Sequence, residues 1–195
     1  VFISRNAKDT IDRYVIPGIN ESSIKSSDQI ISTTSSTTQV LALMVKMLDE
    51  SFGLNRAMMT TVHAYTADQP LADAAGVDLR RSRSAVENII PNTTLAPSIV
   101  ENLMPQFSGK IDGIAFNVPV PNGSCVDLTT ELENTPSVDE ANDAIKSFSK
   151  GSLENIVGYT EDPIVSSDVI GREETMVFDQ KATMMTNDEL LKTLC

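Results

Sequence analysis

Apolar residues recur at helical spacing in two long segments of the chain. The pattern predicts an amphipathic helix over residues 37–52, which Gly53 ends, and another over residues 138–150, which follows Pro136 and Ser137. A shorter helix is expected over residues 97–104, and a last one beginning near Asn187. These helices are spread along the chain and do not alternate strictly with the predicted strands.

Strand patterns dominate the rest of the chain. Runs of β-branched, aromatic and other apolar residues predict strands over residues 1–4, 14–16, 29–32, 56–65, 111–121, 124–132, 156–159, 176–179 and 182–186. Asn122-Gly123 lies between two of these runs and predicts a β-hairpin. Residues 66–97 are largely irregular. The pattern favours an α+β domain with a largely antiparallel or mixed sheet covered by helices.

Composition and net charge limit the kinds of molecule that this chain is expected to bind. The 195 residues are most simply one domain, 41% hydrophobic and 22% charged, without a run of about 18 apolar residues or a signal peptide. The net charge of −12 argues against a nucleic-acid or anionic-membrane partner, because both need a basic surface. The arginines at positions 80, 81 and 83 form too short a cluster to change this interpretation.

Cys125 and Cys195 are the two cysteines, and they lie far apart in the sequence. No Cys-x-x-Cys or Cys/His spacing occurs, so no metal site is predicted. Reduced thiols and a cytoplasmic location are the simplest expectation.

Candidate chemistry lies where a hydroxyl-rich turn, residues 32–38, leads into the first long helix at Ser36 or Thr37. The chain's one histidine, His63, lies near the end of the strand predicted next. A reactive side chain at a helix N-terminus near an imidazole is a layout for nucleophilic catalysis. The residue at the nucleophile position is a serine. Ser36 is therefore either a helix N-cap or a nucleophile activated by His63.

Six segments together resemble the catalytic domain of phosphorylating glyceraldehyde-3-phosphate dehydrogenase. They are residues 32–39, 60–69, 78–85, 88–94, 113–119 and 158–168, and the likeness extends in order over residues 1–195. The resemblance implies that an N-terminal Rossmann domain for NAD or NADP belongs to a full-length parent. It also implies that this chain begins at the last Rossmann strand and stops inside a closing C-terminal helix. No G-x-G-x-x-G follows a strand here, so no cofactor is expected on this chain alone.

The resemblance assigns Ser36 to the position of the family's nucleophilic cysteine and His63 to the base. A serine hydroxyl has a pKa far above neutrality, and a helix dipole of about half a charge does not ionise it. Thioester chemistry is therefore expected to be lost. A cysteine-to-serine exchange introduced to trap a complex is a further interpretation of Ser36.

The family holds its attacking phosphate with hydroxyls that match Ser35, Thr37 and Thr94. The glycine that follows in the family is Leu95 here, and its side chain adds bulk where an anion approaches the backbone.

The substrate phosphate of the family lies against two threonines and an arginine. Thr66 matches the first threonine, whereas Asp68 replaces the second and Asn117 replaces the arginine. A lost arginine contact of about 1.5–3 kcal/mol and an added carboxylate both oppose a dianion.

The prediction is therefore a glyceraldehyde-3-phosphate dehydrogenase-like catalytic domain whose degraded site is inactive in the phosphorylating reaction. Alternatives are a divergent dehydrogenase for a non-phosphorylated aldehyde and a structural or regulatory subunit without activity. A hydrolase triad of Ser36, His63 and Asp68 is the least favoured, since no G-x-S-x-G surrounds Ser36. The family also implies a homo-oligomer, a tetramer formed through the sheet and the loop containing residues 80–83.

Overall fold

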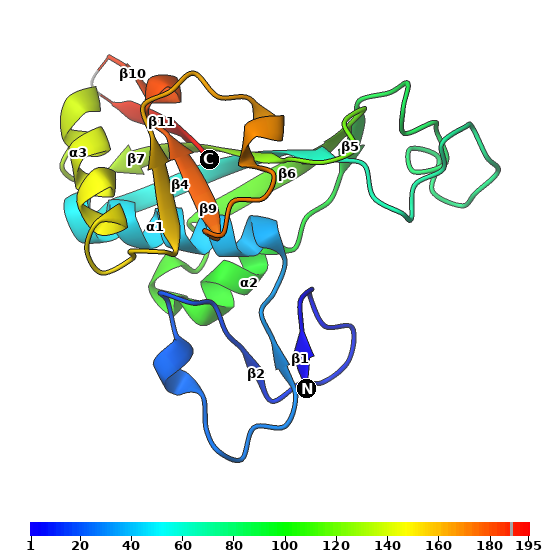
Figure 1. Cartoon of the computed structure of the whole chain (residues 1–195), viewed down its shortest axis with the longest axis horizontal. Coiled ribbons are helices and arrows are strands. Elements are labelled where there is room, and N and C mark those ends of the chain that lie inside the picture. The colour runs from blue at the N-terminus through cyan, green and yellow to red at the C-terminus, as the bar shows by residue number, and fades with distance from the viewer. Residues whose placement is uncertain (188) are drawn as a thin grey trace.

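The computed structural model describes residues 1–187 and 189–195, and its main element is a mixed sheet with the strand order β10-β11-β7-β4-β6-β5 (Figure 1). The central strand β4 pairs in parallel with β6 and antiparallel with β7, and the other neighbouring pairs are antiparallel. The strands are β4 (Leu54–Ala64), β5 (Ile90–Asn92), β6 (Ile111–Val118), β7 (Cys125–Leu132), β10 (Met184–Thr186) and β11 (Leu190–Leu194). The predicted α+β class with a mixed sheet is confirmed.

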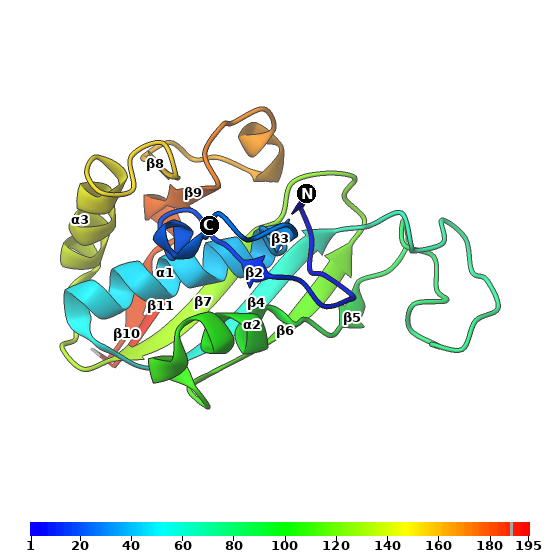
Figure 2. The ribbon, with the colours of Figure 1, turned by 90° about the horizontal axis from the view of Figure 1, so that it is seen from below.

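Three α-helices accompany the sheet: α1 (Ser36–Phe52), α2 (Ala96–Leu103) and α3 (Val138–Ser149). Figure 2 shows α1 and α2 lying along one face of the sheet. Helix α1 is the centre of the core because it packs on β4 and β7 and also on α2 and α3. A helix that is apolar around most of its circumference is stable only when it is covered on several sides. Its fully buried apolar residues are Leu41, Ala42, Leu43, Met44, Val45, Met47 and Leu48.

Two smaller sheets complete the described chain. At the N-terminus, β1 (Phe2–Ile3) and β2 (Arg13–Tyr14) both pair in parallel with β3 (Ile31–Ser32). The other sheet pairs β8 (Val157–Thr160) in parallel with β9 (Met176–Asp179). Short 3-10 helices cover Glu21–Ser23, Pro105–Phe107, Ser166–Val169 and Gln180–Ala182.

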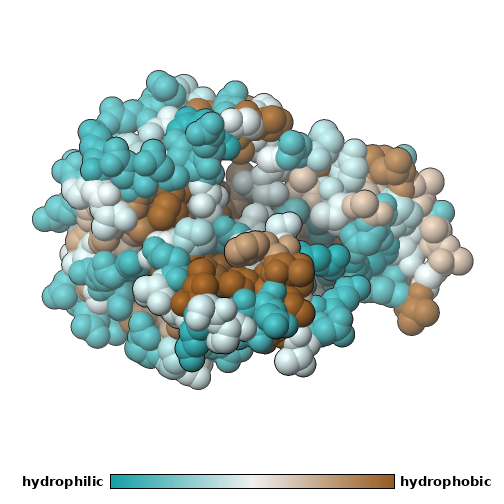
Figure 3. Space-filling view, turned by 60° about the horizontal axis from the view of Figure 1, so that its bottom comes forward, coloured by the Kyte–Doolittle hydropathy of each residue, from teal (hydrophilic) through white to brown (hydrophobic). Residues whose placement is uncertain are grey.

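The lower side of Figure 1, brought forward in Figure 3, carries a group of hydrophobic side chains near the centre of the view. The N-terminal strands lie on that side, where Val1 and Phe2 are exposed by 82% and 77%. Contiguous exposed apolar surface is unusual on an isolated domain and is typical of a contact with another part of a protein.

Alternation along β4 decides which side chains face the helices. Met59 and Thr61 are buried beneath the helical layer, whereas Met58 and Val62 are exposed on the opposite face of the sheet. Since side chains two residues apart share a face, His63 belongs to the helical side together with Thr61. This alternation carries the imidazole toward the N-terminus of α1.

The predicted hairpin across Asn122-Gly123 is wrong. Strands β6 and β7 both form, but β4 lies between them, so they do not pair. Pro119 and Pro121 remove two backbone donors from the connection, which a tightly paired hairpin would need. Gly123 instead packs against another loop, since a Cβ atom there would lie 2.2 Å from the carbonyl oxygen of Ser166.

The predicted closing helix near Asn187 is also wrong. Asn187 lies in a turn, residue 188 lies outside the described residues, and residues 190–194 form β11 against β7. The expectation that the chain stops inside a helix falls with it. Leu191 and Thr193 are buried while Leu190 is exposed, which is the alternation of a strand. The short strand β5 lies in the segment that was expected to be irregular.

Candidate active site

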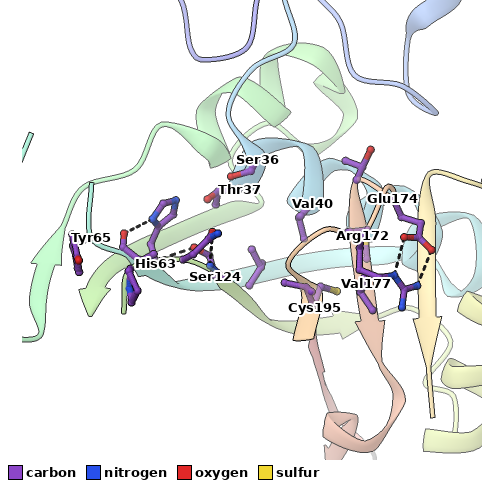
Figure 4. Close-up of a pocket in the computed structure, with 18 residues that line it drawn as sticks. Ser36, Thr37, Val40, His63, Tyr65, Ser124, Arg172, Glu174, Val177 and Cys195 are labelled. Carbon is purple, nitrogen blue, oxygen red and sulfur yellow. Dashed lines mark hydrogen bonds and ion pairs between the residues drawn. The ribbon is translucent and has the colours of Figure 1, made fainter. Parts of the chain in front are cut away.

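A cavity of about 430 Å³ opens where the start of α1 meets the end of β4. Its volume lies in the range of small-molecule sites. Figure 4 shows Ser36, Thr37 and His63 toward one end and Arg172 with Glu174 toward the other. The lining residues are Ser36, Thr37, Val40, His63, Ala64, Tyr65, Pro121, Asn122, Gly123, Ser124, Val126, Val169, Arg172, Glu174, Thr175, Met176, Val177 and Cys195.

The N-terminus of α1 is capped by Ser35, not by Ser36. The Ser35 hydroxyl accepts a hydrogen bond from the backbone N–H of Thr38 at 3.3 Å and lies 2.8 Å from the Thr38 hydroxyl. Ser36 is the first residue of the helix and is exposed. The N-cap interpretation of Ser36 is therefore wrong. Its hydroxyl lines the cavity without a structural hydrogen bond among the described residues.

The turn before the cap is held in an uncommon conformation. Thr34 has φ +66°, a left-handed value that is rare for a β-branched residue. The Thr34 side chain is buried, and the backbone N–H of Thr34 donates to the Ser32 hydroxyl at 3.1 Å. Strain of this kind persists only where the surrounding structure holds it, and it gathers at functional sites. Here it turns the chain from β3 into the first turn of α1.

His63 lines the same cavity and points toward the N-terminus of α1 in Figure 4. Its Nδ1 lies 2.7 Å from the carbonyl oxygen of Ala64. A carbonyl only accepts, so Nδ1 carries the hydrogen, and in the neutral ring Nε2 is the basic nitrogen. No hydrogen bond joins His63 to Ser36 among the residues that the structure describes.

The described hydrogen bonds of the Asp68 side chain do not include one to His63. The Asp68 carboxylate accepts hydrogen bonds from the Thr66 hydroxyl and from the Arg81 guanidinium. These contacts, the Thr66 bond first, hold the pKa of Asp68 below its usual value. The hydrogen bond that a Ser36–His63–Asp68 triad requires is absent from the described contacts. Arg81 also offsets the carboxylate charge, which weakens the expectation that Asp68 repels a dianion.

The remaining predicted phosphate ligands do not line the cavity. The Thr94 hydroxyl accepts from the N–H of Ala96 at the start of α2, and Leu95 is exposed. Asn117 is buried on β6 directly beside His63, where its amide bonds Asn92 and the backbone of β4. Thus the structure brings Ser36, Thr37 and His63 together and leaves Ser35, Thr66, Asp68, Thr94 and Asn117 outside the cavity lining.

The cavity also contains an ion pair that the sequence does not predict. The Arg172 Nε and Nη2 donate to the two carboxylate oxygens of Glu174 at 3.0 Å and 2.7 Å. These bonds lower the pKa of Glu174 to about 2. A Cβ atom at Gly158 would lie 3.2 Å from Arg172 Nη2, so the pair packs closely on β8. Neither residue lies in a periodic segment, and no spacing pattern would have identified them.

The environment of the two cysteines does not favour a thiolate. Both are free, and Cys195 lines the cavity. Burial raises the pKa of Cys195 well above its usual range and also raises the pKa of Cys125. A raised pKa lowers the fraction of thiolate, which is the reactive form of cysteine. The described residues contain no group of three or more His, Cys, Asp or Glu side chains that could hold a metal ion, and no helix long and apolar enough to cross a membrane.

Fold and cavity together define a class: an α+β domain in which a cavity lies between the N-terminus of a buried helix and a histidine near the end of the central strand. Residues 35–195 match the family model described as glyceraldehyde 3-phosphate dehydrogenase, C-terminal domain. The chain therefore belongs to the family of glyceraldehyde-3-phosphate dehydrogenase C-terminal domains.

Individual relatives agree with this assignment. The chain is 44% identical over 195 residues to glyceraldehyde-3-phosphate dehydrogenase 2 of Streptomyces avermitilis, covering 100% of this chain and 58% of the relative. It is 45% identical over 196 residues to the enzyme of Streptomyces coelicolor, with the same coverage of both. It is 43% identical over 189 residues to the Mycobacterium bovis enzyme, covering 97% of this chain and 56% of the relative. The chain thus spans a little over half the length of these curated relatives.

Proposed function

We propose that this chain is the catalytic domain of a glyceraldehyde-3-phosphate dehydrogenase-like protein that does not carry out the phosphorylating oxidation. The observation that carries the proposal is that Ser36 lines the cavity together with His63. The resemblance of the sequence to the family assigns Ser36 to the position of the family's cysteine. An aldehyde that enters the cavity meets a neutral hydroxyl instead of a thiolate. Oxidation through a thioester, which inorganic phosphate would resolve, has no nucleophile here.

Phosphate handling supports the same proposal. The Thr66 hydroxyl donates to Asp68, and Arg81 is paired with that carboxylate. Asn117 is neutral and has only 6% of its surface exposed. A dianion here would have to compete with Asp68 for Arg81, and a charge-assisted bond contributes about 1.5–3 kcal/mol. Weak binding of a triose phosphate follows.

The whole protein is proposed to use NAD or NADP, bound by a domain outside this chain. The exposed apolar side chains of the N-terminal strands support a contact with such a domain. We further propose a homo-oligomer. The outer face of the sheet, with Met58, Val62 and Ile114 exposed, and the projecting loop around Val77 and Leu79 support contacts between copies. A cytoplasmic location remains a prediction.

A second candidate is a dehydrogenase that acts on a non-phosphorylated aldehyde. It is favoured by the apolar part of the cavity lining, which includes Val40, Val126 and Val177. His63 would then take the proton of a hydrate or hemiacetal hydroxyl through Nε2. An inactive structural subunit differs from this candidate in giving no turnover with any aldehyde.

The test uses the full-length parent protein with its cofactor domain. NADH formation is followed with glyceraldehyde 3-phosphate and phosphate, then with unphosphorylated aldehydes, for the wild type, Ser36→Cys and Ser36→Ala. We expect no phosphate-dependent turnover by the wild type and a gain in Ser36→Cys. Phosphate-dependent turnover by the wild type that Ser36→Ala abolishes would refute the proposal. Turnover of an unphosphorylated aldehyde would select the second candidate.

A further inference from the structure

The carbonyl of Ala64, at the end of β4, is the meeting point of two side chains. His63 Nδ1 donates to it at 2.7 Å and Asn117 Nδ2 donates to it at 3.2 Å. Asn117 is the register partner of His63 on the neighbouring strand β6, so both side chains reach the carbonyl from the same face of the sheet. Asn117 therefore shares its acceptor with the imidazole.

This carbonyl depends on side-chain donors because the nearby backbone does not supply them. The N–H of Ala64 donates to the Ser124 hydroxyl just before β7, and the N–H of Gly123 on that side donates to Asn122 Oδ1 at 2.8 Å instead. A buried carbonyl without a donor is costly, and a strand end without a ladder bond is free to rotate its peptide plane. The Asn117 amide supplies a donor to this carbonyl.

The direction of the Asn117 amide follows from its neighbours. The backbone N–H of Thr93 donates to Asn92 Oδ1 at 2.9 Å, so the amide nitrogen of Asn92 faces Asn117. Asn92 Nδ2 then donates to Asn117 Oδ1 at 3.1 Å, which leaves Asn117 Nδ2 for the Ala64 carbonyl. Each step has one donor and one acceptor, so the amide orientations are mutually consistent.

We propose that Asn117, oriented by Asn92, is a positioning residue for His63. By fixing the Ala64 carbonyl, it selects the tautomer in which Nδ1 carries the hydrogen and Nε2 is the basic nitrogen on the cavity side. The inference deepens the proposed function because that function gives His63 its task as a base. The residue that the resemblance placed against the substrate phosphate acts here on the imidazole instead.

The other titratable groups that share the cavity do not provide this control. They are Tyr65, Arg172, Glu174 and Cys195. Arg172 and Glu174 bond each other, and no described hydrogen bond joins any of the four to the ring. Asp68, the carboxylate closest in sequence, is paired with Arg81. The Ala64 carbonyl is thus the described partner of the imidazole.

The chain's single histidine allows a direct test. Nitrogen-15 NMR of the histidine-labelled chain distinguishes protonated from unprotonated ring nitrogens at a pH where the ring is neutral. We expect the wild type to hold the Nδ1–H tautomer. In Asn117→Leu the ratio of the Nε2–H tautomer to the Nδ1–H tautomer should rise about fivefold, the equivalent of one hydrogen bond. Asn92→Ala should shift it in the same direction by less.

Thr61→Val is the matched control, because Thr61 is an inward-facing residue of β4 with no hydrogen-bond partner for its hydroxyl. It should leave the tautomer ratio unchanged. Amide spectra verify that each variant is folded. If Asn117→Leu does not fold, the tautomer ratio of Asn92→Ala tests the proposal. The proposal would be overturned if folded Asn117→Leu had the same tautomer ratio as the wild type. If Asn117→Leu does not fold, an unchanged ratio in Asn92→Ala would overturn it. The readout needs no turnover, so an inactive parent protein would not affect it.

Discussion

The different hydrogen bonding of Ser35 and Ser36 predicts different effects of their substitution on the free energy of unfolding. The Ser35 hydroxyl caps α1 and bonds the buried hydroxyl of Thr38, whereas Ser36 makes no structural hydrogen bond among the described contacts. Replacing Ser35 with alanine removes the cap, which costs about 1 kcal/mol. It also leaves the Thr38 hydroxyl without its partner at a site with 0% exposure, which costs about 1 kcal/mol more.

We therefore expect Ser35→Ala to lower the free energy of unfolding by about 2 kcal/mol. For a chain of this size that corresponds to a fall in Tm of about 4–8 °C. Ser36→Ala should stay within about 0.5 kcal/mol of the wild type because an exposed hydroxyl without partners is lost. Urea denaturation followed by circular dichroism measures both variants under identical conditions.

The pair of variants separates structure from chemistry at adjacent positions. If Ser36→Ala destabilised the chain as much as Ser35→Ala, the hydroxyl of Ser36 would be structural and the site would lose its candidate reactive group. Equal, negligible effects of both substitutions would refute the assignment of the cap to Ser35. The double variant should reproduce the Ser35→Ala value, since only one of the two hydroxyls contributes.

Three further predictions concern other side chains. Thr61→Val removes a buried hydroxyl without a partner and should raise the free energy of unfolding by about 1 kcal/mol in urea titrations; a loss of similar size would contradict its unpaired state. Glu174 has a folded-state pKa of about 2, below its usual 4.5. Its contribution to stability is therefore present above about pH 4.5 and is lost as the pH falls toward 2, so Glu174→Gln should flatten the wild-type decline over this window. Asp68→Asn should change the free energy of unfolding by no more than about 1 kcal/mol, because the ion pair with Arg81 is exposed. The same substitution should strengthen the binding of inorganic phosphate in calorimetric titrations, because it leaves Arg81 without its carboxylate partner. Unchanged phosphate binding would show that Arg81 is not available to an anion.

Local patterns in the sequence predicted most helices and strands, but they did not predict which strands pair with each other. The periodicity of residues 37–52 and 138–150 identified α1 and α3 to within one residue, because an apolar face repeats at a fixed spacing. The order of strands depends on contacts between distant segments. Nothing in the residues around Asn122-Gly123 indicates that β4 separates β6 from β7. The strand β11 was mistaken for a helix because its alternation spans only five residues.

The site was predicted where it depends on sequence order and missed where it depends on packing. Ser36 and His63 follow from a helix start and a strand end, and both line the cavity. Arg172 and Glu174 reach the same cavity from an irregular segment that no periodicity marks. The orientation of Asn117 likewise depends on a register between β4 and β6 that appears only in the folded chain.

The central claim, that residue 36 is not a working nucleophile, can be tested on this chain without a cofactor. The chain is mixed with p-nitrophenyl acetate, and nitrophenol release is compared for the wild type, Ser36→Cys and Ser36→Ala. The alanine variant accounts for the background from the two other thiols, whose raised pKa values make them slow. We predict a burst of about one equivalent from Ser36→Cys, as expected for a single acylated thiol, and identical traces from the wild type and Ser36→Ala. A wild-type burst that Ser36→Ala abolishes would contradict the account and establish Ser36 as an active nucleophile.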